Sequence, residues 1–124
     1  MNKNLKEIIA PQWIEEQQGV YIPLIDRILL KKQVSKMSYH DYIIHAKKNN
    51  IQIATKKELL QIYLQKEEIN DILKKHNGDL LQDWYGSSSE YDTSNMWIVS
   101  LNSGYCSYTY KSKLFFSRVV IKLK

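Results

Sequence analysis

The sequence predicts an α+β fold in which two to three helices precede a C-terminal antiparallel sheet. Capped helical patterns fill residues 38–78, and beyond Gly78 the helix-forming residues give way to Ser, Thr, Tyr, Gly and Trp. Helices in one stretch and strands in the next are typical of α+β proteins. The 124 residues, 44% of them hydrophobic, are enough for one core. We therefore expect a single domain over residues 20–124, preceded by an N-terminal arm over residues 1–19.

The arm and the first strand come before the helices. Pro11 interrupts the arm and Gly19 ends it. Its apolar residues recur near the helical period: Leu5, Ile8, Ile9 and Trp13. We expect a helical arm that packs on the domain or on a partner. Residues 20–30 are rich in Val, Ile, Tyr and Leu around Pro23, which predicts a strand that begins after the proline or lies at a sheet edge.

The first two helices are predicted from their caps and their apolar spacing. Ser38 is an N-cap for a helix that Asn49 and Asn50 end. The apolar face of this helix comprises Tyr39, Tyr42, Ile43 and Ala46. After a short extended link over residues 51–54, Thr55 and Glu58 have the spacing of a capping box. The second helix then presents Leu59, Ile62 and Tyr63 on one face.

A third helix and the sheet complete the prediction. The third helix carries Ile69, Ile72 and Leu73 at helical spacing, and Asn77-Gly78 stops it. In the strand that follows, the residues expected to face the core are Trp97, Val99 and Leu101. Those expected to face outward are Ile98, Ser100 and Asn102. Residues 102–104 predict a hairpin turn before a strand from Tyr105, and residues 118–123 predict the last strand.

Composition narrows the classes of partner. The formal net charge of +5 comes from sixteen Lys and two Arg that are dispersed along the chain. Nucleic-acid grooves concentrate such residues on one element, so we expect solvated surfaces and no nucleic-acid partner. The N-terminus lacks the apolar segment of a secretory signal, and no stretch has the length of a membrane span. We expect a cytoplasmic or virion-associated protein.

The titratable side chains form no catalytic pattern. Cys106 is the single cysteine and has no His or Lys beside it to lower the pKa of a thiol. The three histidines lack the spacing of metal ligands: His40, His45 and His76. The serines at 87–89 have no nucleophile elbow and no histidine nearby in sequence. We therefore expect no enzymatic activity, no cofactor and no bound metal.

The C-terminal third resembles a known family. The similarity rests on residues 84–91 (Trp-Tyr-Gly-Ser-Ser-Ser-Glu-Tyr), on the strand at Trp97, on the Gly104 turn and on residues 116–119 (Phe-Ser-Arg-Val). This pattern is similar to bacterial and phage C-type-lectin-like domains of the Lcl C-terminal, or major paralogous domain, family. The resemblance covers residues 20–124 and implies a C-type-lectin-like fold. It also implies structural roles for the serines at 87–89, for Glu90 and for Arg118. We expect Glu90 and Arg118 to pair with each other.

Three positions depart from the family pattern. Gly86 stands where the family usually has a second Trp, Met96 where a smaller residue is usual, and Ser117 where an apolar residue is usual. The calcium-binding motifs of eukaryotic lectins are absent, so calcium-dependent sugar binding is not implied. Trp84 and Trp97 are expected to fill the core of the sheet or to pair across its strands.

Some proteins of this fold are variable proteins of diversity-generating retroelements, in which adenine changes convert Asn codons into codons for other residues. The corresponding positions here hold Ile98, Ser100, Asn102, Tyr105, Cys106, Ser107, Tyr108, Thr109, Tyr110, Leu114 and Phe115. An Asn codon reaches each of these residues through adenine changes alone. This agreement favours a diversified binding surface.

The expected function is therefore recognition. Tyr supplies rigid contact area and Ser adaptable hydrogen bonds, a mixture that is typical of binding loops. The residues expected to bind a ligand are Ile98, Ser100, Asn102, Tyr105, Ser107, Tyr108, Tyr110, Leu114 and Phe115. The expected partner is a protein or a cell-surface ligand, and the N-terminal arm is a candidate contact for homo-oligomers. The alternative is a structural assembly module of a phage or bacterial complex that has no variable site.

Overall fold

The computed structural model describes residues 10–123, and within this range it contains three helices and ten strands. The helices are α2 (Tyr39–Asn49), α3 (Lys56–Leu64) and α4 (Lys66–Lys75). The strands are β1 (Gln12–Ile14), β2 (Gly19–Ile22), β3 (Arg27–Leu30), β4 (Val34–Met37), β5 (Gln52–Ile53), β6 (Trp84–Glu90), β7 (Asn95–Ser100), β8 (Cys106–Tyr110), β9 (Phe115–Ser117) and β10 (Val119–Ile121). The class is α+β, as predicted, but four strands precede α2.

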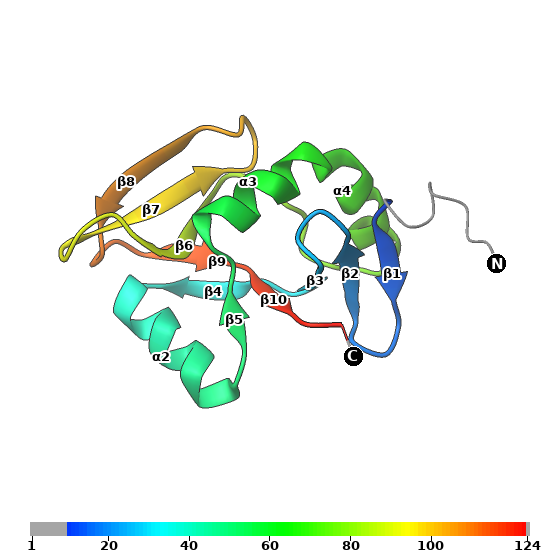
Figure 1. The fold of residues 1–124 in the computed structure, drawn as a ribbon, viewed down its shortest axis with the longest axis horizontal. Coiled ribbons are helices and arrows are strands. Elements are labelled where there is room, and N and C mark those ends of the chain that lie inside the picture. Colours follow the sequence, from blue (N-terminus) through cyan, green and yellow to red (C-terminus); the bar gives the residue numbers. More distant parts are fainter. Residues whose placement is uncertain (1–9, 124) are drawn as a thin grey trace.

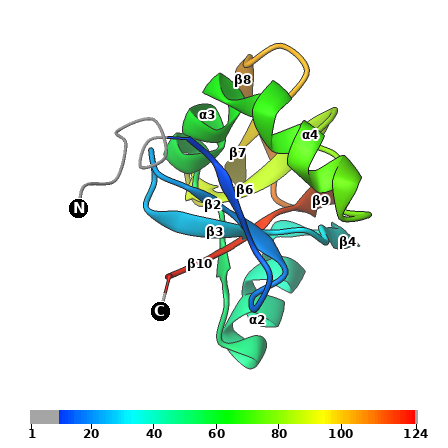
Figure 2. The same cartoon turned by 90° about the vertical axis from the view of Figure 1, so that its right-hand side faces the viewer.

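The strands form two five-stranded sheets (Figures 1 and 2). The first has the order β1-β2-β3-β10-β5, and the second has the order β4-β9-β6-β7-β8. Neighbouring strands are antiparallel except β6 and β9, which run parallel. The chain passes from the second sheet to the first between β9 and β10, at Arg118. The last strand, β10, therefore lies in the first sheet between β3 and the edge strand β5.

The N-terminal region differs from its prediction. Trp13 lies in a strand, not in a helix, because β1 pairs with β2 in a hairpin. The predicted strand over residues 20–30 is two strands, β2 and β3, joined by a turn that contains Pro23 and the left-handed Asp26. Proline removes a backbone donor and suits a turn better than a strand interior. The predicted contacts of Leu5, Ile8 and Ile9 lie outside the described residues.

The helix ends agree with the predictions. The Ser38 hydroxyl accepts a hydrogen bond from the Asp41 amide at 3.3 Å, and Asn50 ends α2 in the left-handed conformation. Thr55 and Glu58 complete a capping box at the start of α3. After α4, the Gly78 amide donates to the Leu73 carbonyl at 2.8 Å. These local contacts satisfy backbone groups that helix ends leave unpaired, which is why they are readable in sequence.

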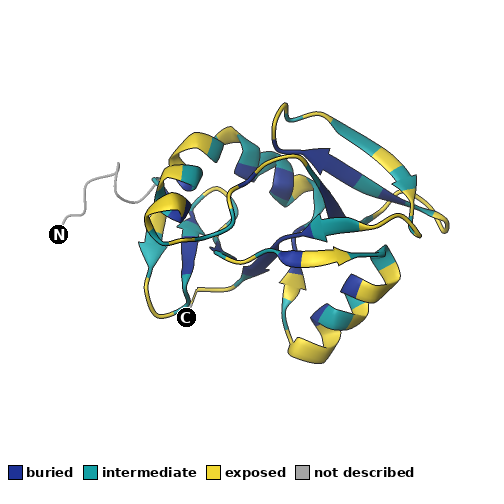
Figure 3. Cartoon of the chain, turned by 180° about the vertical axis from the view of Figure 1, so that it is seen from behind, coloured by how far each residue is buried: buried dark blue, intermediate teal, exposed yellow. Residues whose placement is uncertain are grey.

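Two clusters of buried side chains make the core (Figure 3). One lies beneath α3 and α4 and includes Leu59, Ile62, Ile69 and Leu73. The other is covered by α2 and includes Tyr42, Met96 and Ile98. Helix α3 contacts β6 and β7, whereas α2 contacts β4, β5 and β6. The second sheet is therefore covered by helices on both faces along β6 and β7, but β8 extends beyond this cover.

Candidate functional site

Two of the predicted binding residues are buried. Ile98 is 8% exposed and Ser100 is 5% exposed, so the expectation that this set of β7 residues faces outward is wrong for both. Ile98 belongs to the buried cluster under α2, which also includes Met96. Alternating residues along a strand identify a solvated face only when the sheet is covered on one face and open to water on the other. Here α2 buries the face that the sequence pattern left open.

The other predicted residues follow β8 and the turns beside it. Tyr105, Tyr108, Tyr110 and Leu114 are exposed at 67%, 50%, 62% and 60%. Asn102 is also exposed, and Ser107 and Phe115 are half-buried. In Figure 3 the strand β8 is a mixture of teal and yellow, whereas β7 is mostly dark blue. The exposed part of the predicted site is thus the outer strand and its flanking turns.

Tyr108 belongs to a compact group of rings on one face of the sheet. Its ring stacks on Tyr91 at 3.9 Å between centroids and 4° between planes. Trp97 meets both rings edge-on, at 5.1 Å from Tyr91 and 6.1 Å from Tyr108. Trp97 and Tyr108 lie opposite each other in the β7–β8 ladder, as do Asn95 and Tyr110. We call Tyr91, Trp97, Tyr108 and Tyr110 the ring surface.

Electrostatics reinforce this group. The Lys56 ammonium lies 3.6 Å from the centroid of Trp97, close enough for a cation–π contact. The pKa of Tyr91 is raised, chiefly by the neighbouring Tyr108 hydroxyl and by a hydrogen bond to it. The Tyr91 phenol therefore stays neutral at physiological pH. The ring surface presents phenol hydroxyls and apolar ring edges beside the Lys56 ammonium.

The structure adds Tyr91 to the predicted surface residues and places Trp97 beneath it. Trp97 is half-buried beneath Tyr91 and pairs across the strands with Tyr108, in agreement with the expectation that it fills the core or pairs across strands. Tyr91 is 45% exposed and was not among the predicted binding residues. Its position follows from the tight turn after β6, where the Asp92 carboxylate accepts from the amides of Ser94 and Asn95. An Asp followed by Ser and Asn is a readable signal of such a turn.

Tyr105 points to the opposite face of the sheet. Its ring lies edge-on to Trp84, with 6.3 Å between centroids. Nearby, a groove of about 310 Å³ is lined by Lys36, Asp83, Trp84, Leu114, Phe115 and Phe116. The predicted binding set is therefore divided by the sheet, with Tyr108 and Tyr110 on one face and Tyr105, Leu114 and Phe115 near the other. A single ligand of small size would contact one of these faces.

The serines of β6 form hydrogen bonds with β7, with β5 and with the start of α3. Ser87 donates its hydroxyl to the Trp97 carbonyl at 2.8 Å, and Ser88 donates to the Ile53 carbonyl at 2.9 Å. The Ser89 hydroxyl accepts from the Lys56 amide at 3.0 Å, at the start of α3. This structural role agrees with the expectation from the sequence. It also places Lys56 beside Trp97.

The expected pair of Glu90 and Arg118 is wrong. Glu90 forms its ion pair with Lys111, near the end of β8. Arg118 is fully buried and donates to the carbonyls of Asp79 at 2.7 Å and Leu30 at 3.1 Å. Burial is the main cause that lowers the pKa of Arg118. The guanidinium therefore ties the crossing point of the two sheets to the end of β3 and to the segment that follows α4.

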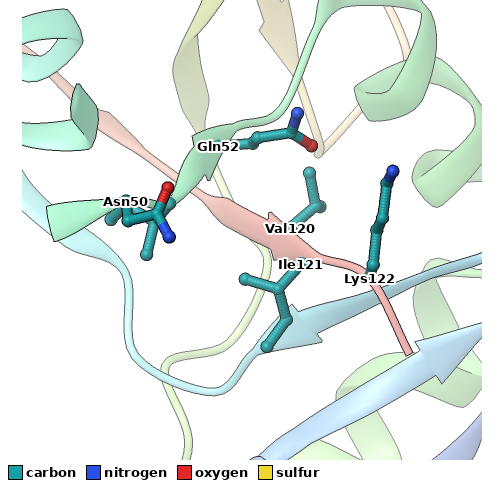
Figure 4. Close-up of a pocket in the computed structure, with 6 residues that line it drawn as sticks. Asn50, Gln52, Val120, Ile121 and Lys122 are labelled. Atoms are coloured by element: carbon teal, nitrogen blue, oxygen red, sulfur yellow. The ribbon is translucent and has the colours of Figure 1, made fainter. Parts of the chain in front are cut away.

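A second hollow lies at the edge of the first sheet (Figure 4). It measures about 430 Å³ and is lined by Asn50, Ile51, Gln52, Val120, Ile121 and Lys122. It forms because β5 has only two residues and leaves the end of β10 unpaired on that side. In Figure 4, Val120 and Ile121 point to opposite sides of the strand. The hollow thus wraps around a strand edge, and none of the predicted binding residues lines it.

Residues 10–123 contain no group of three His, Cys, Asp or Glu side chains arranged to hold a metal ion. In the same range no helix has the length and apolarity required to cross a bilayer. No model of a known protein family matches the chain, and no curated protein is detectably similar to it. The geometry of the exposed surface is therefore what indicates a function.

Proposed function

We propose that the chain is a binding protein whose exposed rings around β8 recognise a protein or a cell-surface ligand. One observation carries this proposal. Among the described residues ten large hydrophobic side chains are exposed, and five of them lie between residues 91 and 114: Tyr91, Tyr105, Tyr108, Tyr110 and Leu114. Clustered exposed apolar groups mark interaction sites, whereas single ones are ordinary. Tyrosine is also enriched among residues that dominate binding energy.

The scaffold that we propose is C-type-lectin-like. The order of elements supports it, because α2 and α3 precede the β6-β7-β8 meander and the last strand returns to the first sheet beside β3. The departure at Gly86 has a local explanation. A Cβ atom at this position would lie 2.7 Å from the Tyr42 hydroxyl, so the ring of Tyr42 fills the space that a larger residue would need.

Diversification by a retroelement is proposed for a reduced set of positions. Burial removes Ile98 and Ser100, since variation at these two buried positions would disturb the packing of β7. The exposed positions that an Asn codon reaches are Asn102, Tyr105, Tyr108, Tyr110 and Leu114. The test is the neighbouring DNA, where a near-copy of the 3′ coding region should differ only at adenines beside a reverse transcriptase gene. Diversification would be refuted if the near-copy also differed at other bases, or if no near-copy were present.

Binding itself is tested with a random peptide display library selected on the immobilised protein. The selected peptide is then titrated against the variant Tyr105→Ala/Tyr108→Ala/Tyr110→Ala. We expect its affinity to fall at least about tenfold, because truncated aromatic anchors each cost 1 kcal/mol or more at an interface, by order of magnitude. The control is Leu24→Ala/Leu64→Ala, which removes equally exposed apolar groups elsewhere. Equal binding to the triple variant and the wild type would refute the proposal.

A further inference from the structure

The open edge of β8 differs from the other sheet edges. The two sheets end in four edge strands, namely β1, β5, β4 and β8. Strands β1 and β5 have three and two residues, and β4 contains Lys36. Strand β8 has five residues, Cys-Ser-Tyr-Thr-Tyr, with no charge and no proline. Native proteins protect exposed edge strands with charges, with prolines or by keeping them short, and β8 has none of these features.

The pattern of backbone hydrogen bonds between β7 and β8 shows which backbone groups of β8 point away from β7. The Ser100 amide donates to the Tyr105 carbonyl at 2.8 Å, and the Lys111 amide donates to the Ser94 carbonyl at 3.0 Å. Hydrogen-bonded positions alternate along an antiparallel pair, so Ser107 and Thr109 also direct their backbone groups toward β7. The amides of Cys106, Tyr108 and Tyr110 therefore point to the open edge. The carbonyls of Cys106 and Tyr108 do the same, whereas the Tyr110 carbonyl accepts from Lys113.

We propose that this edge pairs with β8 of a second copy of the chain, antiparallel about Tyr108. Donors and acceptors that repeat about every 7 Å along a line are matched by another extended backbone. A second copy suits this edge because the strand is complementary to itself. The twofold places Tyr108 opposite Tyr108 and Cys106 opposite Tyr110 on one face, and Ser107 opposite Thr109 on the other.

Charge also favours a second copy at this strand. The chain has a formal net charge of +5, so most surfaces of two copies repel each other. Within β8 no charged side chain meets its counterpart, and the adjoining Lys111 is paired with Glu90. Aromatic pairs and Ser–Thr pairs across strands are stabilising contacts. The pairing would join the two second sheets and place both ring surfaces on the same face, so a bound partner would meet two copies.

A proline variant with a matched alanine tests the backbone contribution. Both Tyr110→Pro and Tyr110→Ala remove the ring, but only the proline removes the outward amide. Proline is tolerated on an edge strand where its nitrogen faces solvent, and Thr109 before it is already extended. Sedimentation of the full chain over a concentration series should show a wild-type dimer. We expect the dimer dissociation constant of the proline variant to exceed that of the alanine variant about tenfold, because two hydrogen bonds are lost per dimer.

A cysteine variant tests the register. In Tyr110→Cys the new thiol lies opposite Cys106 of the other copy, where Cα atoms about 5.5 Å apart permit a disulfide. We expect a dimer cross-linked through Cys106 on mild oxidation. Thr109→Cys is the control, because its side chain is on the other face of the strand. The wild type should also stay uncross-linked, since its two Cys106 residues would be about 13 Å apart along the strands.

The outcomes are decisive in both directions. A monomeric wild type at all soluble concentrations would overturn the proposal, as would equal dimerisation of the proline and alanine variants. Cross-linking of Thr109→Cys as fast as Tyr110→Cys would overturn the register. Thermal melting of each variant confirms that it is folded. The peptide-binding experiment has a different readout, so failure of self-pairing leaves the proposed binding function standing.

Discussion

Two groups of tyrosines in this chain have opposite surroundings. Tyr42 and Tyr85 are buried, and each hydroxyl is held by polar groups of the core. The Tyr42 hydroxyl donates to the Ser87 carbonyl at 2.6 Å, and the Tyr85 hydroxyl donates to the Gln33 side chain at 2.9 Å. Tyr105, Tyr108 and Tyr110 are exposed on and around β8. The same residue type thus stabilises the fold in one region and forms a candidate contact surface in the other.

The difference arises from what covers each strand. Tyr42 lies on α2 and points onto β6, and Tyr85 lies on β6 with strands on both sides. Strand β8 is the last in its sheet and has a neighbour on one side only. A buried phenol must find a partner for its hydroxyl, whereas an exposed phenol bonds to water. Substitutions should therefore affect stability in the first region and binding in the second.

The largest loss of stability is expected for Arg118→Ala. This change leaves the carbonyls of Asp79 and Leu30 without their donors and opens a cavity beside the Tyr85 ring, 5.9 Å away. We expect the free energy of unfolding to fall by about 3–5 kcal/mol, measured by urea denaturation. Arg27→Ala is the control, since Arg27 donates to the adjacent Asp26 carbonyl, and should cost less than about 1 kcal/mol. Equal losses would show that Arg118 does not tie the sheets.

A smaller loss is expected for Gly86→Ala. The added methyl would lie 2.7 Å from the Tyr42 hydroxyl and 3.0 Å from its ring. Overpacking of this kind costs about 1–3 kcal/mol. In a Tyr42→Phe background the closest atom is gone, so the same change should cost less, and a double-mutant cycle measures the coupling. Additive costs in the cycle would contradict the contact.

The hydroxyls of the two regions are compared directly by Tyr42→Phe and Tyr108→Phe. The first change leaves the buried Ser87 carbonyl without its donor, and we expect a loss of about 1–2 kcal/mol. The second removes an exposed hydroxyl, and the change should be within about 0.5 kcal/mol. Thermal denaturation of both variants provides the measurement. A larger effect at Tyr108 would mean that the ring surface contributes to the core.

Alkaline pH should weaken the buried region selectively. Burial raises the pKa of Tyr42 above its ordinary value near 10. The folded state thus holds this proton more tightly than the unfolded state. Its contribution is fully present below about pH 10 and declines as pH rises further, by up to about 1.4 kcal/mol per pH unit. Alkaline unfolding monitored by circular dichroism should be less steep in Tyr42→Phe, and an unchanged slope would refute the assignment.

The smallest effect is expected for Tyr110→Ala. The side chain is exposed, and truncation of such a residue changes stability by less than about 0.5 kcal/mol. The thermal midpoint should therefore match the wild type at a protein concentration where the chain is monomeric. At high concentration the comparison with Tyr110→Pro isolates self-pairing. A fall of several degrees at low concentration would place Tyr110 among the stabilising tyrosines.

Local signals predicted the helical part of this fold well. Ser38, Thr55 and Gly78 each act through contacts within a few residues, so their roles are written in adjacent sequence. The hairpin at Gly104 was also readable, because a positive φ of 77° there favours glycine. The strand β4 and the hairpin of β1 with β2 were missed. Strand β1 has only three residues, too few to show an alternating pattern, and β4 pairs with the distant strand β9.

The candidate site was predicted in part for a similar reason. Exposure of Tyr105, Tyr108 and Tyr110 followed from the scarcity of apolar partners near them in sequence. Burial of Ile98 depends on α2, whose Tyr42 lies more than fifty residues earlier. The expected pairing of Glu90 with Arg118 was wrong for the same reason. Lys111, which follows β8, forms the ion pair with Glu90 instead. Contacts between distant segments leave no periodic signal in either segment.

The sequence by itself determined the class of fold, the helices with their caps, and the concentration of tyrosines near the C-terminus. These properties depend on local backbone chemistry and on composition. Only the tertiary structure decided which face of β7 is covered, how the sheet divides the exposed rings, and that Arg118 is buried where the chain changes sheets. It also left β8 without an outer neighbour. Burial and edge exposure are properties of the assembled layers, because each depends on which distant segments pack against a strand.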